Sequence, residues 1–366
     1  MPKVKKKNKS ARDQHNRNQF TIRSVGTYIS PLKPYAASSI GSYIVDSVKQ
    51  FNSDQCLFPK MKTEDEIKFP FDLNIGFESY VPTESTGNSW TFLLKWICQH
   101  NFDLASIDLV VRRGVLRKIA DTLFDHYKEP WTFKLCKYQN TVYFNEIETA
   151  RSKERKTKET EKDKRCQYWG LNFERLVTEE PKESVSEMSS SYSVVTSTIN
   201  KHRVLMRAEI DCTAHDDPAD FVELKTALEP SNPNMDRNFK RNKLNKVWLQ
   251  SYLCGIKNVI YGFRDNDGNI TSLKHYKTSD LPKICSNYWD AGAMMSFLKA
   301  LLTWALPQIE EGHTSTLSFS GHDNIILTKA ANPGHFLPEW YVEYLSRSPS
   351  DIDDDYLKTL MTKKFF

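Results

Sequence analysis

The chain has 366 residues, of which 39% are hydrophobic, so it is long enough to bury a sizeable core as one large domain or two ordinary ones. No apolar run approaches the roughly 20 residues of a membrane helix, and the charged first residues lack the hydrophobic segment that directs secretion, which predicts a nuclear or, alternatively, a cytoplasmic protein with no membrane partner. Seven cysteines without a CxxC pair argue against a disulfide framework and a structural zinc site.

Charge is unevenly distributed along the chain. The net charge of +5, from 51 basic and 46 acidic residues, does not by itself indicate a nucleic-acid-binding protein. Residues 1–18, however, hold seven lysines and arginines and a single acid, Asp13. Because this segment has few apolar residues to offset the entropy of ordering, we predict a disordered basic arm. Such an arm suits nuclear import or phosphate contacts, and equally a tail that only improves solubility.

Hydrophobic periodicity predicts the elements of the first half of the chain. They are a helix over 86–100, a strand over 106–113, a helix over 113–127 and a hairpin over 131–147 that turns at Gln139-Asn140. Two polar stretches without apolar periodicity, 149–166 and 181–193, are predicted to be solvated loops. A helix over 166–179 lies between them.

The second half alternates strands and helices less regularly. The predicted elements are two neighbouring strands over 203–215 and 220–228, a long helix over 236–254, a strand pair around the turn DNDGN, a helix over 288–306 and a hairpin over 315–329. Mixed strands and helices without regular βα alternation predict an α+β fold, with residues 19–366 forming one domain.

Four side chains in the two neighbouring strands carry the functional signal. Alternate residues of a strand share a face, so Glu209 and Asp211 can point together, as can Glu223 and Lys225. If the strands pair, three carboxylates and one ammonium converge, and the crowded acids repel one another unless a cation binds them. Ligands that are oxygens without thiolates favour Mg²⁺ or Mn²⁺ over zinc.

The spacing of these residues matches a known arrangement. Asp211, followed after eleven residues by Glu223-Leu224-Lys225, is similar to the D…(D/E)-x-K pattern of a broad nuclease superfamily, in which acids hold metal and the lysine acts on water. One such match is weak evidence, because acids and lysines are common on solvated strand faces. Glu209 and the apolar residues interleaved in both segments strengthen it.

Two helices supply further candidates. In Gly170-Leu171-Asn172-Phe173-Glu174, the glycine lies one turn before the acid, which suggests a close backbone approach beside an inward-pointing carboxylate. In the segment 239–250, Lys243 and Gln250 are among the basic and amide side chains that can line one side of a helix and bind a phosphate backbone, together with Arg241 and Lys246. The alternative for both segments is a solvated helix face.

In chain order, R-G, G-x-x-F-E, E-h-D, E-L-K and K-L-x-K-x-W-x-Q resemble the successive motifs of the family of decapping and exoribonuclease proteins, DXO and its fungal nuclear relatives. The resemblance spans about Arg113 to Arg264. It implies a single domain with two mixed β-sheets flanked by helices, and a deep nuclease cleft that holds two divalent ions, Mg²⁺ or Mn²⁺.

The same resemblance implies a role for each motif residue. Glu174, Glu209, Asp211 and Glu223 match the metal-binding acids, with the backbone carbonyl of Leu224 near metal. The catalytic group is Lys225 with Glu209, Asp211 and Glu223. Arg113, Lys225 and Gln250 match residues that contact the 5′ nucleotide and its phosphates. One departure from the family pattern is Arg112, where relatives often carry an aromatic residue.

The expected activity is therefore metal-assisted hydrolysis at RNA 5′ ends. It would remove pyrophosphate, incomplete caps or NAD-type caps to leave 5′-monophosphate RNA, with or without continued 5′-to-3′ degradation. Two alternatives stay open. One is a mainly non-catalytic partner and activator of a nuclear 5′-to-3′ exoribonuclease, and the other is a DNA endonuclease of the wider superfamily.

Overall fold

The computed structural model describes residues 18–53, 58–81, 90–179, 184–185, 188–347, 352–353, 355–357 and 360. The predicted basic arm, except for Asn18, lies outside the described residues. No helix in the described part of the chain is long and apolar enough to cross a membrane. The six described cysteines are all free thiols, and only Cys166 is exposed.

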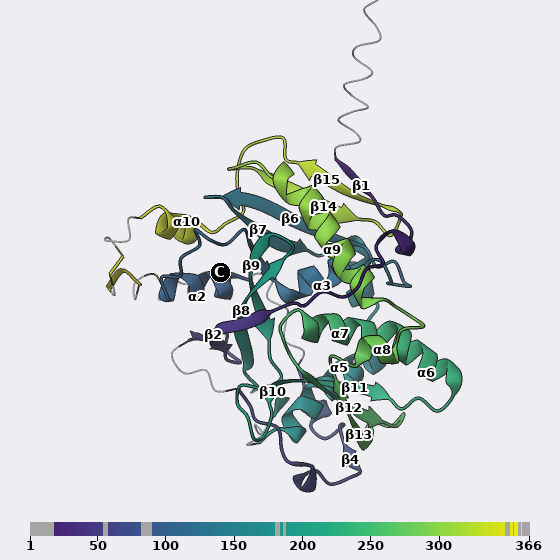
Figure 1. Ribbon diagram of the computed structural model, residues 1–366. Coiled ribbons are helices and arrows are strands. Elements are labelled where there is room, and N and C mark those ends of the chain that lie inside the picture. Colours follow the sequence, from purple (N-terminus) through teal and green to yellow (C-terminus); the bar gives the residue numbers. More distant parts are fainter. Residues whose placement is uncertain are drawn as a thin grey trace, which may run out of the picture.

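The strands form two sheets (Figure 1). The larger sheet has ten strands, in the spatial order β1 (Gln19–Thr21), β15 (Asn324–Lys329), β14 (Thr314–Phe319), β6 (Trp131–Tyr138), β7 (Thr141–Ile147), β5 (Leu109–Arg112), β9 (His202–Glu209), β8 (Ser190–Ile199), β2 (Ala37–Val45) and β3 (Phe51–Asn52). The smaller sheet has five, in the order β10 (Cys212–Thr213), β11 (Phe221–Leu228), β12 (Asn258–Arg264), β13 (Asn269–Lys277) and β4 (Phe71–Asp72).

Both sheets are mixed. In the larger sheet β5 runs parallel to β7 and β9, and in the smaller sheet β11 runs parallel to β12, while the other pairs are antiparallel. Helices cover the sheets: α2 (Thr91–Gln99), α3 (Arg113–Asp121), α4 (Ala150–Thr157), α5 (Glu161–Val177), α6 (Pro233–Phe239), α7 (Asn245–Tyr252), α8 (Leu281–Ile284), α9 (Ala291–Ala305) and α10 (Glu339–Leu345). This confirms the predicted α+β domain with two mixed sheets and flanking helices.

Helix α7 lies between the two sheets (Figure 1). Its apolar residues, with those of α3 and α9, join one face of each sheet in the largest core cluster, which contains Trp248 from α7, Val111 from β5 and Tyr261 from β12. The opposite face of the ten-stranded sheet packs on α2 and α10, and that of the five-stranded sheet packs on α5. The polar ends of α3, α5 and α7 are thereby brought to the junction of the two sheets.

The helix α5 reaches its sheet through a glycine that is not in the predicted motif. A Cβ on Gly262 of β12 would lie 2.5 Å from the ring of Phe173, so only glycine allows this approach. Gly170, in contrast, has no atom within 4 Å of the position of its missing Cβ. The expectation that Gly170 permits a close backbone contact is therefore wrong.

Two predicted loops contain regular structure. Residues 150–157 form α4 and residues 161–166 begin α5, because Thr149 and Thr160 cap the two N-termini and Asp163 completes a capping box with Thr160. This stretch is solvated, as expected, but it is helical. In the second predicted loop, Val185 is buried and β8 begins at Ser190, while residues 181–183 and 186–187 lie outside the described part.

The expected pairing of the strands over 203–215 and 220–228 is largely wrong. Both edges of β9 are already hydrogen-bonded, to β5 and to β8, so β9 has no edge left for β11. The chain instead crosses between the sheets at Ile210 and Asp211, and only Cys212–Thr213 pairs with β11. The crossing places Glu209 and Asp211 at the junction of the sheets.

Other predicted helices and strands are present in the structure, but some of them begin or end at different residues. The hairpins over 131–147 and 315–329 and the strand pair around Gly268 are confirmed. The helix predicted over 113–127 ends at Asp121, and the long helix over 236–254 is interrupted by a π-helical turn, Lys240–Leu244, between α6 and α7. Helix α10 was not predicted.

Candidate active site

Glu223 lies at the centre of the cluster at the sheet junction. This carboxylate on β11 is fully buried, and it accepts contacts from three side chains on three elements. Lys225 and Gln250 both donate to Oε1, and Arg113 Nη1 lies 3.4 Å from Oε2. A buried carboxylate with this many donors is held in one orientation. Three of the predicted motifs, from α3, β11 and α7, therefore meet at one acid.

Asp211 and Lys225 form the second part of the cluster. The Oδ2 atom of Asp211 accepts from the backbone N–H of Leu224 at 2.7 Å and from the Nζ atom of Lys225 at 3.2 Å. The same ammonium donates to the carbonyl oxygen of Leu224 at 2.7 Å. Lys225 thus contacts three oxygens at once, from Asp211, Glu223 and Leu224, and these are oxygens that the family resemblance assigns to metal.

Glu174 and Glu209 complete the group of acids. With Asp211 they line one cavity of about 130 Å³, Glu174 from α5 and Glu209 from the end of β9. Each predicted acid therefore lies at the junction of the sheets. Their placement depends on the packing of α5 on the smaller sheet and on the crossing of the chain at Asp211, and not on a hairpin.

Burial and mutual repulsion perturb ionisation in this cluster. Burial, followed by the charge of Glu223, raises the pKa of Asp211 to about 7, and burial together with Asp211 holds the pKa of Glu174 well above its usual range. Glu223 behaves differently. Burial disfavours its charge, but Lys225 and Arg113 outweigh that effect and lower its pKa. Burial opposes the charge on Lys225 too, yet Asp211 and Glu223 raise its pKa.

The donor set fits a hard divalent cation by its chemistry. Four carboxylates and a backbone carbonyl are oxygen ligands of the kind that Mg²⁺ and Mn²⁺ prefer. Oxygens of Asp211, Glu223 and Leu224 already contact one cation, the ammonium of Lys225. Within the described residues, no three His, Cys, Asp or Glu side chains converge tightly enough to hold an ion. The ammonium of Lys225 would have to move for an ion to reach these oxygens.

The basic segment of the long helix is only partly at the site. Gln250 is at the site, four residues beyond Lys246 on α7, but Lys246 lies 3.6 Å from Asp125 and 3.8 Å from Asp121. Lys243 is exposed on the π-helical turn, and none of the contacts among the described residues joins it to the carboxylates. The structure therefore brings Gln250, but not Lys243, to the acid cluster.

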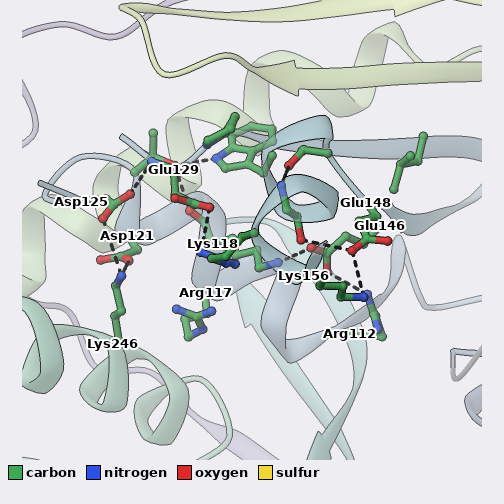
Figure 2. A pocket seen from close by; sticks show the side chains of 17 residues that line it. Arg112, Arg117, Lys118, Asp121, Asp125, Glu129, Glu146, Glu148, Lys156 and Lys246 are labelled. Carbon is green, nitrogen blue, oxygen red and sulfur yellow. Dashed lines mark hydrogen bonds and ion pairs between the residues drawn. The ribbon is translucent and has the colours of Figure 1, made fainter. Parts of the chain in front are cut away.

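A highly charged cavity of about 510 Å³ adjoins the site along α3 (Figure 2). Arg112, next to Arg113, donates to Glu146 at 2.8 Å, and Lys118 donates to the other oxygen of Glu146. Arg112 thus stands where the family often has an aromatic residue, and it is held by an ion pair. Arg117 makes no hydrogen bond or ion pair to any residue that the structure describes.

We predict that Asp121, on the wall of this cavity, makes stability depend on pH. Burial raises its pKa from 3.8 to about 6, against the opposing charge of Lys246. Below about pH 6 the folded chain therefore binds a proton that the unfolded chain lacks. Protonation of Asp121 should raise the free energy of unfolding by about 1 kcal/mol as the pH falls from 7 to 5. Urea unfolding at pH 5, 6 and 7 should show a flatter profile for Asp121→Asn. Parallel profiles for the two proteins would refute the assignment.

We also predict that Arg113→Met destabilises the fold by about 2–4 kcal/mol, because it leaves the buried Glu223 without one of its two cations. The control is Arg112→Met, whose more exposed ion pair should be worth about 1 kcal/mol or less. Urea unfolding measures both. Combining Arg113→Met with Glu223→Gln should cost less than the sum of the single changes. Equal losses for the two arginines would contradict the central role of Glu223.

Sequence patterns gave no sign of two residues that line the acid cavity. Lys49 and Tyr80 face the same space as Glu174, Glu209 and Asp211. Lys49 follows β2 and has a left-handed backbone, with φ of 65°. A lysine beside three acids is suited to neutralising a bound phosphate. Neither residue belongs to a local motif, so only the fold reveals them.

Comparison with known proteins gives consistent matches. Residues 36–342 match the model of the family described as RAI1-like PD-(D/E)XK nuclease. The human decapping and exoribonuclease protein is 28% identical over 341 residues, which cover 85% of each chain. By fold, the chain is similar to Scheffersomyces stipitis Rai1 in complex with (3′-NADP)⁺ and calcium, with a TM-score of 0.77, 21% identity and coverage of 89% and 99% of the two chains. It is also similar to Candida albicans Rai1 in complex with pU5 and Mn²⁺, with a TM-score of 0.74, 18% identity and coverage of 93% and 100%. Because the family model spans most of its length, the chain belongs to the RAI1-like PD-(D/E)XK nuclease family.

Proposed function

We propose that this protein is a divalent-metal-dependent hydrolase of RNA 5′ ends that leaves a 5′-monophosphate. The observation that carries the proposal is the convergence of Arg113, Glu223, Lys225 and Gln250 beside Asp211. The name of the human relative and the ligands of the two yeast proteins, a dinucleotide and a short 5′-phosphorylated RNA, support the same substrate class. The substrates would be triphosphate ends, incomplete caps and NAD-type caps.

The metal would be Mg²⁺ or Mn²⁺, and two ions would bind. Glu174, Glu209, Asp211 and Glu223 would hold them, with the carbonyl oxygen of Leu224. Calcium and manganese in the complexes of the relatives support a divalent ion. When bound, such an ion stabilises charge on the reacting phosphate and lowers the pKa of bound water.

The other side chains of the site have roles that follow from their contacts. Arg113 and Gln250 meet Glu223 from α3 and α7, and they present donors toward the phosphates of a 5′ nucleotide. The ammonium of Lys225 contacts Asp211, Glu223 and the carbonyl oxygen of Leu224, and from there it would act as a positive charge that orients water or phosphate. Lys243 would contact RNA farther from the 5′ end, because it is exposed and none of the contacts among the described residues joins it to the acids.

The proposal is tested with RNAs that differ only at the 5′ end. Purified protein is incubated with triphosphate, unmethylated-cap, NAD-capped and monophosphate RNA, each with Mg²⁺ or with chelator, and with single-stranded and duplex DNA of the same sequence. We expect metal-dependent release of a 5′-monophosphate RNA from one or more of the modified ends, while shortening of the monophosphate RNA would add exonuclease activity. Cleavage of DNA alone would favour the endonuclease alternative.

We further propose that the protein is nuclear and binds a nuclear 5′-to-3′ exoribonuclease. The basic residues before Asn18 support nuclear import. The resemblance to fungal nuclear relatives supports an exoribonuclease partner. Deleting residues 2–17 should abolish nuclear accumulation while hydrolysis of a short RNA stays unchanged. Co-purification of an exoribonuclease with the full-length protein from its own cells tests the partner, and unchanged localisation of the deletion variant would contradict the role of the arm.

A further inference from the structure

A second large cavity lies at the end of β8 and the start of β9, and the acid Glu209 lies at the opposite end of β9. Its volume is about 770 Å³, and its lining includes Arg203 at the start of β9 and Thr198 near the end of β8. Glu209 is at the other end of β9, six residues from Arg203, which corresponds to about 20 Å along a strand. The cavity is therefore separate from the proposed hydrolytic site.

The charge of this cavity has one sign. Lys33, Arg203 and Lys299 line it, and no aspartate or glutamate does. None of the three cations makes an ion pair with another residue that the structure describes. The cavity beside α3 is different, because five of its six basic side chains face a carboxylate. Three unpaired cations around one hollow attract an anion.

The remaining lining provides neutral donors and aromatic rings. Hydroxyl and amide groups come from Ser38, Ser106, Thr196, Ser197, Thr198 and Asn200. Ser197 is buried, and its hydroxyl lies beside the phenol of Tyr35. Tyr35 stacks on Tyr252 with centroids 5.1 Å apart, and Tyr252 stacks on Trp248 at 4.8 Å. Hydroxyls and amides complement cations in binding phosphate, and an aromatic stack suits a base.

We propose that this cavity binds a phosphate-bearing nucleotide, with Arg203, Lys299 and Lys33 on the phosphate and the Tyr35–Tyr252 stack beside the base. The nucleotide is either free or part of an RNA chain. An acidic protein segment fits less well, since the cavity has the volume of a small-ligand site, roughly 300–1,000 Å³, and carries stacked rings. The proposal does not depend on hydrolysis at the acid cluster.

The test measures binding in chelator, so that no RNA is hydrolysed. The probes are adenosine 5′-monophosphate, followed by calorimetry, and a labelled decauridylate with a 5′-hydroxyl, followed by fluorescence anisotropy. Full-length wild-type protein is compared with Arg203→Gln/Lys299→Gln. The matched control, Lys134→Gln/Lys257→Gln, removes the same charge from exposed lysines outside the cavity. Circular dichroism verifies that both variants fold.

We expect Arg203→Gln/Lys299→Gln to weaken binding of at least one probe by about tenfold or more and to flatten its salt dependence, while the control changes it less than about twofold. Loss of adenosine monophosphate binding identifies a free nucleotide as a ligand, and loss confined to the decauridylate identifies RNA. The proposal is overturned if both variants lose binding equally or if neither probe binds. It is also overturned if Arg203→Gln/Lys299→Gln weakens binding of a hexaglutamate peptide but leaves binding of both nucleotide probes unchanged.

Discussion

Replacing Asp211 with alanine is expected to reduce hydrolysis of triphosphate RNA by about a thousandfold or more while the protein stays folded. The carboxylate of Asp211 contacts the Lys225 ammonium, and its removal would take away one of the several acids proposed to hold the metal ion. The free energy of unfolding should change by about 1 kcal/mol or less, because relief of repulsion between buried acids offsets the lost hydrogen bond to Leu224.

Turnover and urea unfolding of the Asp211→Ala protein should be measured together. The matched control is Asp211→Asn, which keeps an oxygen that can accept from the Leu224 N–H but removes the charge. The Asp211→Asn protein should be as inactive as the Asp211→Ala protein, and its free energy of unfolding should be at least as large as that of Asp211→Ala. A rate close to that of wild type at saturating Mg²⁺ in either variant would remove Asp211 from the metal site.

Replacing Lys225 with alanine is expected to lower kcat by roughly a hundredfold to a thousandfold without weakening the response to metal. An ammonium cannot ligate a cation, and here it contacts the oxygens of Asp211, Glu223 and Leu224. Because the ammonium contacts oxygens that are proposed to bind metal, its loss should leave the Mg²⁺ concentration for half-maximal rate unchanged or lower.

The measurement is a Mg²⁺ titration of rate for wild type and Lys225→Ala. Lys225→Arg serves as the control, since it keeps the charge but replaces a compact ammonium with a wide planar group, and it should recover only part of the activity. Full recovery of the alanine variant at high Mg²⁺ would show that Lys225 serves metal binding and not water or phosphate.

Features that depend on neighbouring residues in the chain could be predicted from the sequence. The hairpin over 131–147 turns at Gln139 and Asn140, which both adopt the left-handed conformation that such turns require. The motif residues could also be predicted as a group, since Glu223 and Lys225 flank the buried Leu224 on one strand. The capping box at Thr160 and Asp163 was a local signal too, although the segment was predicted to be a loop.

Features that depend on distant segments could not be predicted in this way. The break between β9 and β10 follows from the pairing of β9 with β5 and β8. The residues around Ile210 carry no sequence signal, such as a proline or glycine, that predicts the break. Lys49 reaches the acid cavity because β2, which it follows, pairs with β8, and β8 pairs with the strand β9 that carries Glu209. The ion pairs of Lys246 with Asp121 and Asp125 likewise depend on the packing of α7 on α3.

The acids at the junction of the sheets are proposed to hold the ion on which hydrolysis depends. The most direct test titrates Mn²⁺ into the metal-free protein, with bound ion followed by electron paramagnetic resonance and the rate on triphosphate RNA measured in parallel. Wild type should bind Mn²⁺ and gain activity over the same concentration range, and the Glu174→Gln/Asp211→Asn variant should lose both. Undiminished hydrolysis in excess chelator, or Mn²⁺ binding that this double variant leaves intact, would contradict the account.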